Sequence, residues 1–236
     1  MDRPADSAGA ETLDIMRAAP QYNQWQYGVI APFIGQRVLE VGAGIGNISE
    51  HILSEPRELV ILTDTDTWYC EQLRDRFKDR ARVETLTLPD EHARQRFSPD
   101  RLDTILALNV VEHIEDDIGT LTAMRDMVTE GGRVIILVPA LKALFGSLDR
   151  ELGHYRRYTR KSLSSAVEAA GLRLEELKWF NRVGALGWWF NARIRKAPRI
   201  PITQLRAFDA IVPAARMEQA LPLPFGQSLI AVGMRI

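Results

Sequence analysis

Short apolar runs alternate with segments of helical periodicity along most of this chain. The run LDTILAL is apolar almost throughout, which is typical of a strand that is covered on both faces. The runs RVLEVG and ELVILTD have the same character. We therefore predict strands at residues 37–42, 58–64, 82–88, 102–108 and 133–139, and two late strands at 173–180 and 228–236.

Helices are expected between these strands. Apolar residues recur at helical spacing from Ile118 to Val128, and Gly131-Gly132 is expected to end that helix. Thr159 has the character of an N-cap for the helix that follows it. The remaining helices are predicted at residues 20–34, 47–55 and 69–79. Such alternation predicts one α/β domain with an open, largely parallel sheet and helices on both faces.

Composition narrows the function classes. With 236 residues, of which 46% are hydrophobic, the chain can bury a sizeable core, and its formal net charge of -1 argues against a nucleic-acid partner. The chain has a single cysteine, and its N-terminus lacks the pattern of a signal peptide. The apolar stretch GALGWWF is too short to span a bilayer, so membrane association is not expected. We predict a soluble, cytoplasmic protein.

A glycine-rich turn follows the first predicted strand. Glycine lets a backbone approach a ligand closely, and ligands of open α/β sheets bind beyond the carboxyl ends of the strands. The turn reads G-A-G-I-G-N, which departs from the G-x-G-x-x-G of dinucleotide-binding folds. Glu40 precedes the turn, and Asp64 closes the next strand. This pattern favours a nucleoside ligand without a pyrophosphate.

The E-x-G-x-G-x-G pattern with an acidic residue at the end of the next strand resembles the class I S-adenosylmethionine-dependent methyltransferases. LDTILALNVVEHI is similar to the fourth strand of that family and the loop after it, and EGGRVIILVP to the fifth strand. GHYRRYTRKSLSSAVEAAGL is similar to a segment of the small-molecule members. The resemblance covers roughly residues 22–236. It implies a Rossmann-like, mostly parallel seven-stranded sheet with a late antiparallel strand pair, and S-adenosyl-L-methionine as the cofactor.

The resemblance implies roles for the first turn. The backbone of Gly42, Ala43 and Gly44 would approach the methionine part of the cofactor, and Glu40 would fix the turn or bind the ammonium group. Asp64 would accept hydrogen bonds from the ribose hydroxyls.

Other residues would complete the cofactor pocket. Asp66 competes with Asp64 for the ribose, and Thr65 lies between them. Asn109 would lie near the sulfonium, or it is a turn residue that bonds its own backbone. The family's usual acidic partner of adenine is missing. Its position falls at Thr87 and Leu88, so Leu88, Asp90 or backbone groups are the candidates for that contact.

His113 lies where the methyl group would sit. It is a candidate to act as a base or to orient the acceptor, and the alternative is a histidine held by neighbouring carboxylates at a helix start. Glu112, His113 and Asp116 match no strong metal signature, so we predict no metal.

The segment GHYRRYTRK is expected to reach over the acceptor. His154 and Tyr155 are predicted to line the site. Tyr158 could stack on an acceptor, and Arg156 or Arg157 could pair with an anionic one; the alternative is a solvated basic loop.

Residues 1–19 are expected to be loosely held, and residues 20–236 to form the methyltransferase domain. Residues 20–34 and the long, irregular stretch 181–227 are predicted to cap the site, with Trp188, Trp189 and Phe190 as possible acceptor contacts. The predicted activity is in-line transfer of a methyl group to a small-molecule acceptor, which is apolar or anionic. The alternative is a non-catalytic module that binds a cofactor or a partner on the same fold. The atom that is methylated and the oligomeric state are not determined by the sequence.

Overall fold

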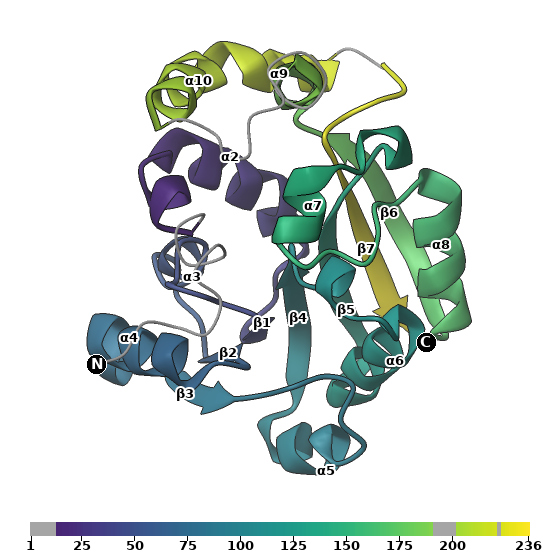
Figure 1. Ribbon diagram of the computed structural model, residues 1–236. Helices are drawn as coiled ribbons and strands as arrows, with labels where there is room; N and C mark the ends of the chain where they lie inside the picture. Colours follow the sequence, from purple (N-terminus) through teal and green to yellow (C-terminus); the bar gives the residue numbers. More distant parts are fainter. Residues whose placement is uncertain (1–12, 191–201, 221–222) are drawn as a thin grey trace.

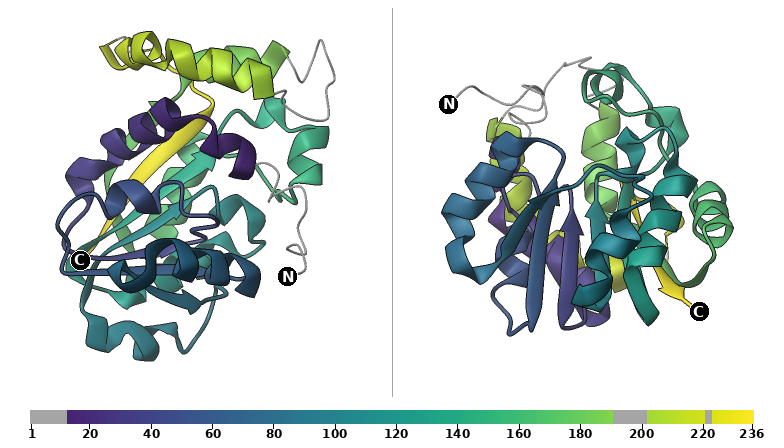
Figure 2. Two further views of the ribbon diagram at one scale, coloured as in Figure 1. Left: turned by 90° about the vertical axis from the view of Figure 1, so that its left-hand side faces the viewer. Right: turned by 90° about the horizontal axis from the view of Figure 1, so that it is seen from below.

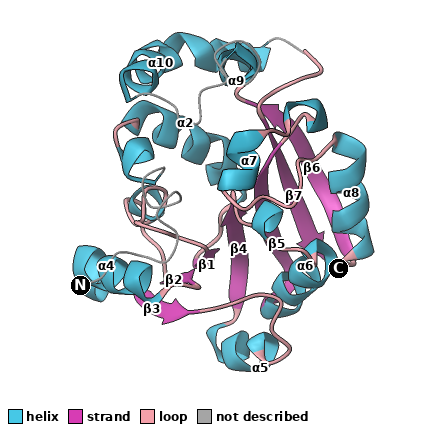
Figure 3. Ribbon diagram, in the orientation of Figure 1, coloured by secondary structure: helices cyan, strands magenta, loops and turns pink. Residues whose placement is uncertain are grey.

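A seven-stranded sheet forms the centre of the protein (Figure 1 and Figure 3). The computed structural model describes residues 13–190, 202–220 and 223–236. The sheet order is β3-β2-β1-β4-β5-β7-β6. The strands are β1 (Arg37–Val41), β2 (Leu59–Asp64), β3 (Arg82–Thr85), β4 (Leu102–Leu108), β5 (Val128–Pro139), β6 (Leu172–Phe180) and β7 (Ser228–Arg235).

Strand directions confirm the predicted topology. β3, β2, β1, β4 and β5 run parallel, whereas β7 is antiparallel to both β5 and β6. The chain first builds the sheet outward from β1 to β3 and then returns to place β4 on the other side of β1. The strand order reverses between β1 and β4, and this is the place where open α/β sheets bind ligands.

Helices cover both faces of the sheet. Alternate residues of β5 point into two separate cores: Val134 and Ile136 into one, and Ile135 and Leu137 into the other. Figure 2 shows the helices on either side of the sheet. The longer elements are α2 (Pro20–Ile30), α4 (Thr67–Phe77), α6 (Asp117–Met127), α8 (Arg160–Ala169), α9 (Arg182–Phe190) and α10 (Ile202–Ala215). The shorter ones are α3 (Ser49–Ile52), α5 (Ala93–Phe97), α7 (Ser147–Glu151) and the 3-10 turns η1 (Ala31–Phe33), η2 (Lys78–Arg80), η3 (Ser98–Asp100), η4 (Val111–His113), η5 (Lys142–Leu144) and η7 (Arg216–Ala220).

Side-chain caps open α4, α6 and α8, with Asp116 as the cap of α6. The Thr159 hydroxyl accepts a hydrogen bond from the Ser162 amide at 3.0 Å, as predicted, and α8 begins there. Asp66 caps α4 in the same way by accepting from the Trp68 amide at 2.8 Å. The role of Asp66 as a helix cap was not foreseen from the sequence.

The boundary between α6 and β5 was predicted wrongly. The helix already ends at Met127, and Val128 pairs with Leu102 in the sheet. Gly131-Gly132 lies inside β5, at the point where the register against β4 shifts. The glycine pair therefore accommodates an irregularity in the strand, and helix periodicity alone could not distinguish this from a helix end.

Two other segments also differ from the prediction. β3 ends at Thr85, before the predicted residue 88. The stretch 181–227 is largely helical in its described part, because α9 and α10 lie within it.

Residues 13–17 are helical, so helical structure begins before Pro20. No helix of the described ranges is long and apolar enough to cross a membrane.

Candidate active site

One large cavity opens at the carboxyl ends of β1, β2 and β4. Its volume is about 1250 Å³, which exceeds the roughly 300–1,000 Å³ of an ordinary small-ligand pocket. The cavity thus has room for a nucleoside cofactor and a second molecule. All eleven predicted site residues lie on its wall: Glu40, Gly42, Ala43, Gly44, Asp64, Thr65, Leu88, Asn109, His113, His154 and Tyr155.

The glycine turn forms one wall of this cavity. A side chain on Gly42 would place its Cβ atom 2.5 Å from Cγ2 of Val110, and one on Gly44 would come within 2.7 Å of Cδ1 of Leu13. Both glycines also have positive φ, of +67° and +55°. The turn can therefore follow this path beside the cavity only without side chains at these two positions.

Asp64 joins the turn to β2. Its Oδ2 atom accepts a hydrogen bond from the Gly44 amide at 2.9 Å, and its Oδ1 atom accepts one from the Asp66 amide at 3.1 Å. Burial raises the pKa of Asp64 and outweighs these backbone hydrogen bonds, which lower it. Each carboxylate oxygen has a second lone pair, so Asp64 can still accept a ligand hydroxyl.

Glu40 lies beneath the same turn. Its side chain is buried and accepts a hydrogen bond from the Ser49 hydroxyl at 2.5 Å. Burial raises the pKa of Glu40 to about 7. A cationic group of a ligand placed here would favour the ionised carboxylate.

The floor of the cavity is formed by two loops. Leu86, Thr87 and Leu88 follow β3 and supply mostly apolar surface. Asn109 follows β4 with φ of +56°, and its amide donates to the Leu137 carbonyl at 2.8 Å. Asn109 thus borders the cavity with its backbone in the left-handed conformation of a turn.

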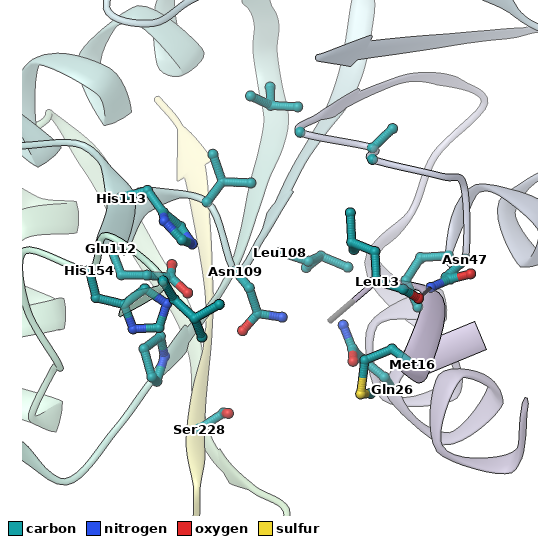
Figure 4. Close-up of a pocket in the computed structure, with 18 of the residues that line it drawn as sticks. Leu13, Met16, Gln26, Asn47, Leu108, Asn109, Glu112, His113, His154 and Ser228 are labelled. Carbon is teal, nitrogen blue, oxygen red and sulfur yellow. Dashed lines mark hydrogen bonds between the residues drawn. The ribbon is translucent and has the colours of Figure 1, made fainter. Parts of the chain in front are cut away.

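The predicted acceptor residues come together from two distant segments. The Tyr155 amide donates to the Glu112 carbonyl at 2.8 Å, which ties the loop after α7 to η4. The rings of His113 and His154 lie edge to face with their centroids 4.6 Å apart. Figure 4 shows both imidazoles, with Glu112 beside them, on one side of the cavity, and Leu13 and Asn47 on the other.

His154 is oriented by a buried carboxylate. Its Nδ1 atom lies 3.0 Å from Oδ1 of Asp149, and the same oxygen accepts from Nε of Arg157 at 2.7 Å. Burial acts to raise the pKa of Asp149, but hydrogen bonds from His154, Arg157 and the Gly146 amide hold it below its usual value. Asp149 is then an acceptor only, so Nδ1 of His154 donates to it and Nε2 is the ring nitrogen not engaged by Asp149.

Glu112 is the polar side chain whose position the sequence did not reveal. Its carboxylate is fully buried, and neither oxygen has a hydrogen-bond partner among the described residues. Burial raises its pKa to about 8. Glu112, His113 and His154 each offer a ligand atom, and these atoms lie within 4.8 Å of one another.

The other side chains of the GHYRRY segment have structural roles. Tyr158 is buried and donates to Asp117, so it cannot stack on an acceptor. Arg157 is committed to Asp149 and to the Ala140 carbonyl, and Arg156 pairs with Asp117. Only Tyr155 among these side chains is well exposed, with 55% of its surface accessible. The alternative of a solvated basic loop is wrong for Arg157, which is buried.

The cap contributes residues that no sequence motif marked. α2 and α10 pack side by side, as Figure 1 shows, and Asp209 of α10 accepts from the Tyr22 amide at 2.8 Å. The cap residues on the cavity wall are Leu13, Ile15, Met16, Tyr22, Asn23, Gln26, Asn181, Val183, Gly184, Gly187, Gln204, Leu205 and Phe208. The side chains of Trp188, Trp189 and Phe190 lie outside the described residues.

Residues 14–177 match a protein family described as a methyltransferase domain. The chain belongs to this family. It is an S-adenosylmethionine-dependent methyltransferase, as the sequence predicted.

Solved structures share the fold at low sequence identity. A chain from the Haloferax volcanii complex of the Trm112 methyltransferase activator with a methyltransferase has a TM-score of 0.65 and 16% identity over 99% of both chains. The CurJ carbon methyltransferase has a TM-score of 0.58 and 17% identity, covering 86% of this chain and 49% of that one.

The curated relatives include polyketide synthases. A polyketide synthase component of lovastatin nonaketide synthase from Aspergillus terreus is 33% identical over 106 residues, which is 42% of this chain and 4% of that protein. A highly reducing polyketide synthase, PKS2 from Leptosphaeria maculans, is 31% identical over 113 residues. The chain matches only about 4% of the length of these relatives.

Proposed function

We propose that this methyltransferase transfers the methyl group to a small molecule that has an apolar body, held beneath the cap formed by α2, α9 and α10. The observation that carries this proposal is the size and lining of the large cavity, which is lined by the glycine turn and Asp64 and also by apolar residues of the cap. The polyketide synthases among the relatives also support a small-molecule acceptor. A carbon-rich acceptor of that kind would suit the apolar part of the lining.

The proposed cofactor residues belong to the glycine turn and to the two strands beside it. Bound S-adenosylmethionine supplies an electrophilic methyl group on a sulfonium. We assign Gly42, Ala43 and Gly44 to close backbone approach, Glu40 to the cofactor's ammonium, and Asp64 to its ribose hydroxyls. The Asp64 carboxylate, held in place by the Gly44 and Asp66 amides, and the buried carboxylate of Glu40 support these roles.

Three further residues complete the proposed cofactor pocket. Thr65 lies next to Asp64, Leu88 provides an apolar face for adenine, and Asn109 lies between the two sides of the cavity in Figure 4. We assign Asn109 to the neighbourhood of the sulfonium.

The acceptor side is assigned to His113, His154 and Tyr155. These side chains hold the reacting atom of the acceptor in line with the methyl group, which is the main task of the protein in such a displacement. The hydrogen bond from His154 to Asp149 supports this role because it fixes the direction of the second ring nitrogen.

Calorimetric titration tests the cofactor assignment. Wild type is expected to bind S-adenosylhomocysteine and not NADH. Asp64→Ala is expected to lose at least about tenfold in affinity, since a bidentate set of hydrogen bonds contributes more than about 1.4 kcal/mol. Asp66→Ala serves as the matched control, because Asp66 also lies on the cavity wall but caps α4. The opposite ranking of the two variants would transfer the ribose role to Asp66.

Turnover separates an enzyme from a binding module. The protein is incubated with labelled S-adenosylmethionine and a panel of apolar and anionic small molecules, and label in the acceptor is measured. Turnover that depends on His154 supports the acceptor assignment. Tight cofactor binding without turnover on any acceptor would favour the non-catalytic alternative.

A further inference from the structure

We propose that Glu112, His113 and His154 form a binding site for a divalent transition-metal ion in the wall of the cavity. Two imidazoles and one carboxylate are a donor set that suits ions such as Zn²⁺, Mn²⁺ and Fe²⁺. Spacing along the chain does not indicate this set of ligands, because His154 lies 41 residues beyond His113 and no pattern connects them. This inference replaces the metal-free interpretation of the sequence.

Ligand atoms of the three side chains lie within 4.8 Å of one another. Atoms that coordinate one ion at about 2.0–2.2 Å lie roughly 3–4 Å apart, so a small rotation of the side chains completes the site. His113 is exposed to the cavity and can make this rotation. Figure 4 shows the three side chains gathered in one place, with the carboxylate of Glu112 next to both rings.

Glu112 provides an independent observation. A fully buried carboxylate normally accepts several hydrogen bonds, yet both oxygens of Glu112 lack a partner among the described residues. The carboxylate borders the same cavity as the two imidazoles. A bound cation satisfies both oxygens and explains why an acidic side chain occupies this position.

The surroundings of His154 fit a metal ligand as well. Its Nδ1 atom is hydrogen-bonded to Asp149, and Asp149 is held in turn by Arg157 and the Gly146 amide. Metal-bound histidines usually donate their other ring nitrogen to a carboxylate in this manner, which fixes the tautomer and the ring orientation. Nε2 of His154 is thereby left as the coordinating atom.

Three protein ligands leave open coordination positions that face the cavity. The ligand that fits them is an acceptor with an oxygen atom at, or next to, the atom that is methylated. The ion would stabilise that oxygen as an anion after its proton leaves to water; the nucleophile's electron pair then forms the bond to the methyl carbon as the carbon–sulfur bond breaks. With the ion bound, His113 and His154 act on the acceptor through the metal. This use of the ion rests on the proposed function, whereas metal binding itself does not.

Titration of the metal-stripped protein with Zn²⁺, without cofactor, tests the site. Wild type is expected to bind one ion per chain, and Glu112→Gln, His113→Ala and His154→Ala are each expected to weaken binding by at least about tenfold. Glu91 and His92 provide the matched control, because they are an adjacent Glu-His pair at an exposed position. The double variant Glu91→Gln/His92→Ala is expected to bind as wild type does.

Co²⁺ gives a second measurement. Its visible absorption spectrum reports the coordinating atoms, so the spectrum of the wild-type complex is expected to change in both histidine variants and not in the Glu91/His92 control. Equal Zn²⁺ binding by wild type and all variants, or no binding by any of them, would overturn the proposed site.

Affinity for S-adenosylhomocysteine, measured on the same proteins, verifies that each variant is folded and separates the two proposals. Metal binding without S-adenosylhomocysteine binding defeats the proposed function alone. S-adenosylhomocysteine binding and turnover in a protein that takes up no metal defeat the metal site alone.

Discussion

Two buried glutamates lie on the wall of the same cavity, and they are stabilised in different ways. Glu40 lies in β1, and its hydrogen-bond partner is close in the sequence: it accepts from the hydroxyl of Ser49, nine residues later. Glu112 comes from η4, and its oxygens have no hydrogen-bond partner among the described residues. The buried carboxyl group of the cofactor wall thus has a hydrogen-bond partner within the protein, whereas that of the acceptor wall is left for an additional ligand.

The two walls also differ in how they are assembled. Gly42 and Gly44 follow β1 and Asp64 ends the adjacent strand β2, so the hydrogen bond from the Gly44 amide to Asp64 connects neighbouring elements. The acceptor wall instead joins η4 to the loop after α7, and Asp149 and Arg157 hold that loop in place. The cofactor wall therefore depends on contacts between neighbouring elements, whereas the acceptor wall depends on a few long-range contacts.

The largest effect is expected for Asp149→Ala. The side chains of Asp149 and Arg157 are each only 1% exposed, and removal of one member of such an ion pair usually costs about 3–5 kcal/mol of unfolding free energy. Glu175→Ala, which removes the partner of the more exposed Arg133, is expected to cost less than about 1 kcal/mol.

Chemical denaturation of Asp149→Ala and Glu175→Ala measures the loss of unfolding free energy in each variant. The affinity of folded Asp149→Ala for S-adenosylhomocysteine is expected to remain near that of wild type, because the cofactor wall does not use this ion pair. Equal costs for the two variants would contradict the view that the acceptor wall depends on Asp149.

Glu40→Gln is expected to change the pH dependence of stability. Burial raises the pKa of Glu40 to about 7 in the folded protein, so its contribution is fully present below the ordinary value of 4.5 and is lost as pH rises through 7. Relative to the variant, wild type should therefore lose on the order of 3 kcal/mol between pH 4.5 and pH 8.

Denaturation of both proteins across this pH range, without cofactor, tests the Glu40 prediction. Asp90→Asn is a suitable comparison because Asp90 lies in an exposed loop and caps a turn through the His92 amide. A difference between wild type and Glu40→Gln that stays constant with pH would show that the buried carboxylate does not titrate in this range.

Comparison of Gly46→Ala with Gly131→Ala separates the cost of overpacking at the glycine turn from the cost of backbone strain. A side chain at Gly46 would collide with the Phe77 ring, whereas one at Gly131 would meet nothing within 4 Å, and the two residues have similar φ values of +80° and +76°. Both alanine variants should suffer backbone strain, but Gly46→Ala should cost about 2 kcal/mol more because of overpacking. Thermal and chemical unfolding of the pair measure this difference, and equal costs would mean that Phe77 moves aside freely.

The smallest effect is expected at Asn109, between the two walls. Its φ of +56° favours Asn or Gly, so Asn109→Ala should cost about 1 kcal/mol, and Asn109→Gly should be nearly neutral in stability. S-adenosylhomocysteine affinity is then measured on the stable Gly variant. Reduced affinity supports a contact by the Asn109 side chain, while unchanged affinity leaves Asn109 with a turn role only.

The sequence by itself determined the sheet, its parallel order and the position of the cofactor turn. These features depend on local periodicity and on residues close in the chain, such as Gly42 and Glu40, so each leaves a readable pattern. The same patterns misplaced the start of β5, because the Gly131-Gly132 pair is compatible with both a helix end and a strand irregularity.

Only the tertiary structure decided the acceptor wall. In the sequence, Glu112 stands among acidic neighbours and suggests a solvated helix start, but packing buries it completely next to His154. Likewise, nothing in the sequence near Leu13 indicates that this residue lines the cavity. Burial and the approach of distant segments are properties of the packed chain as a whole, and short-range patterns in the sequence do not encode them.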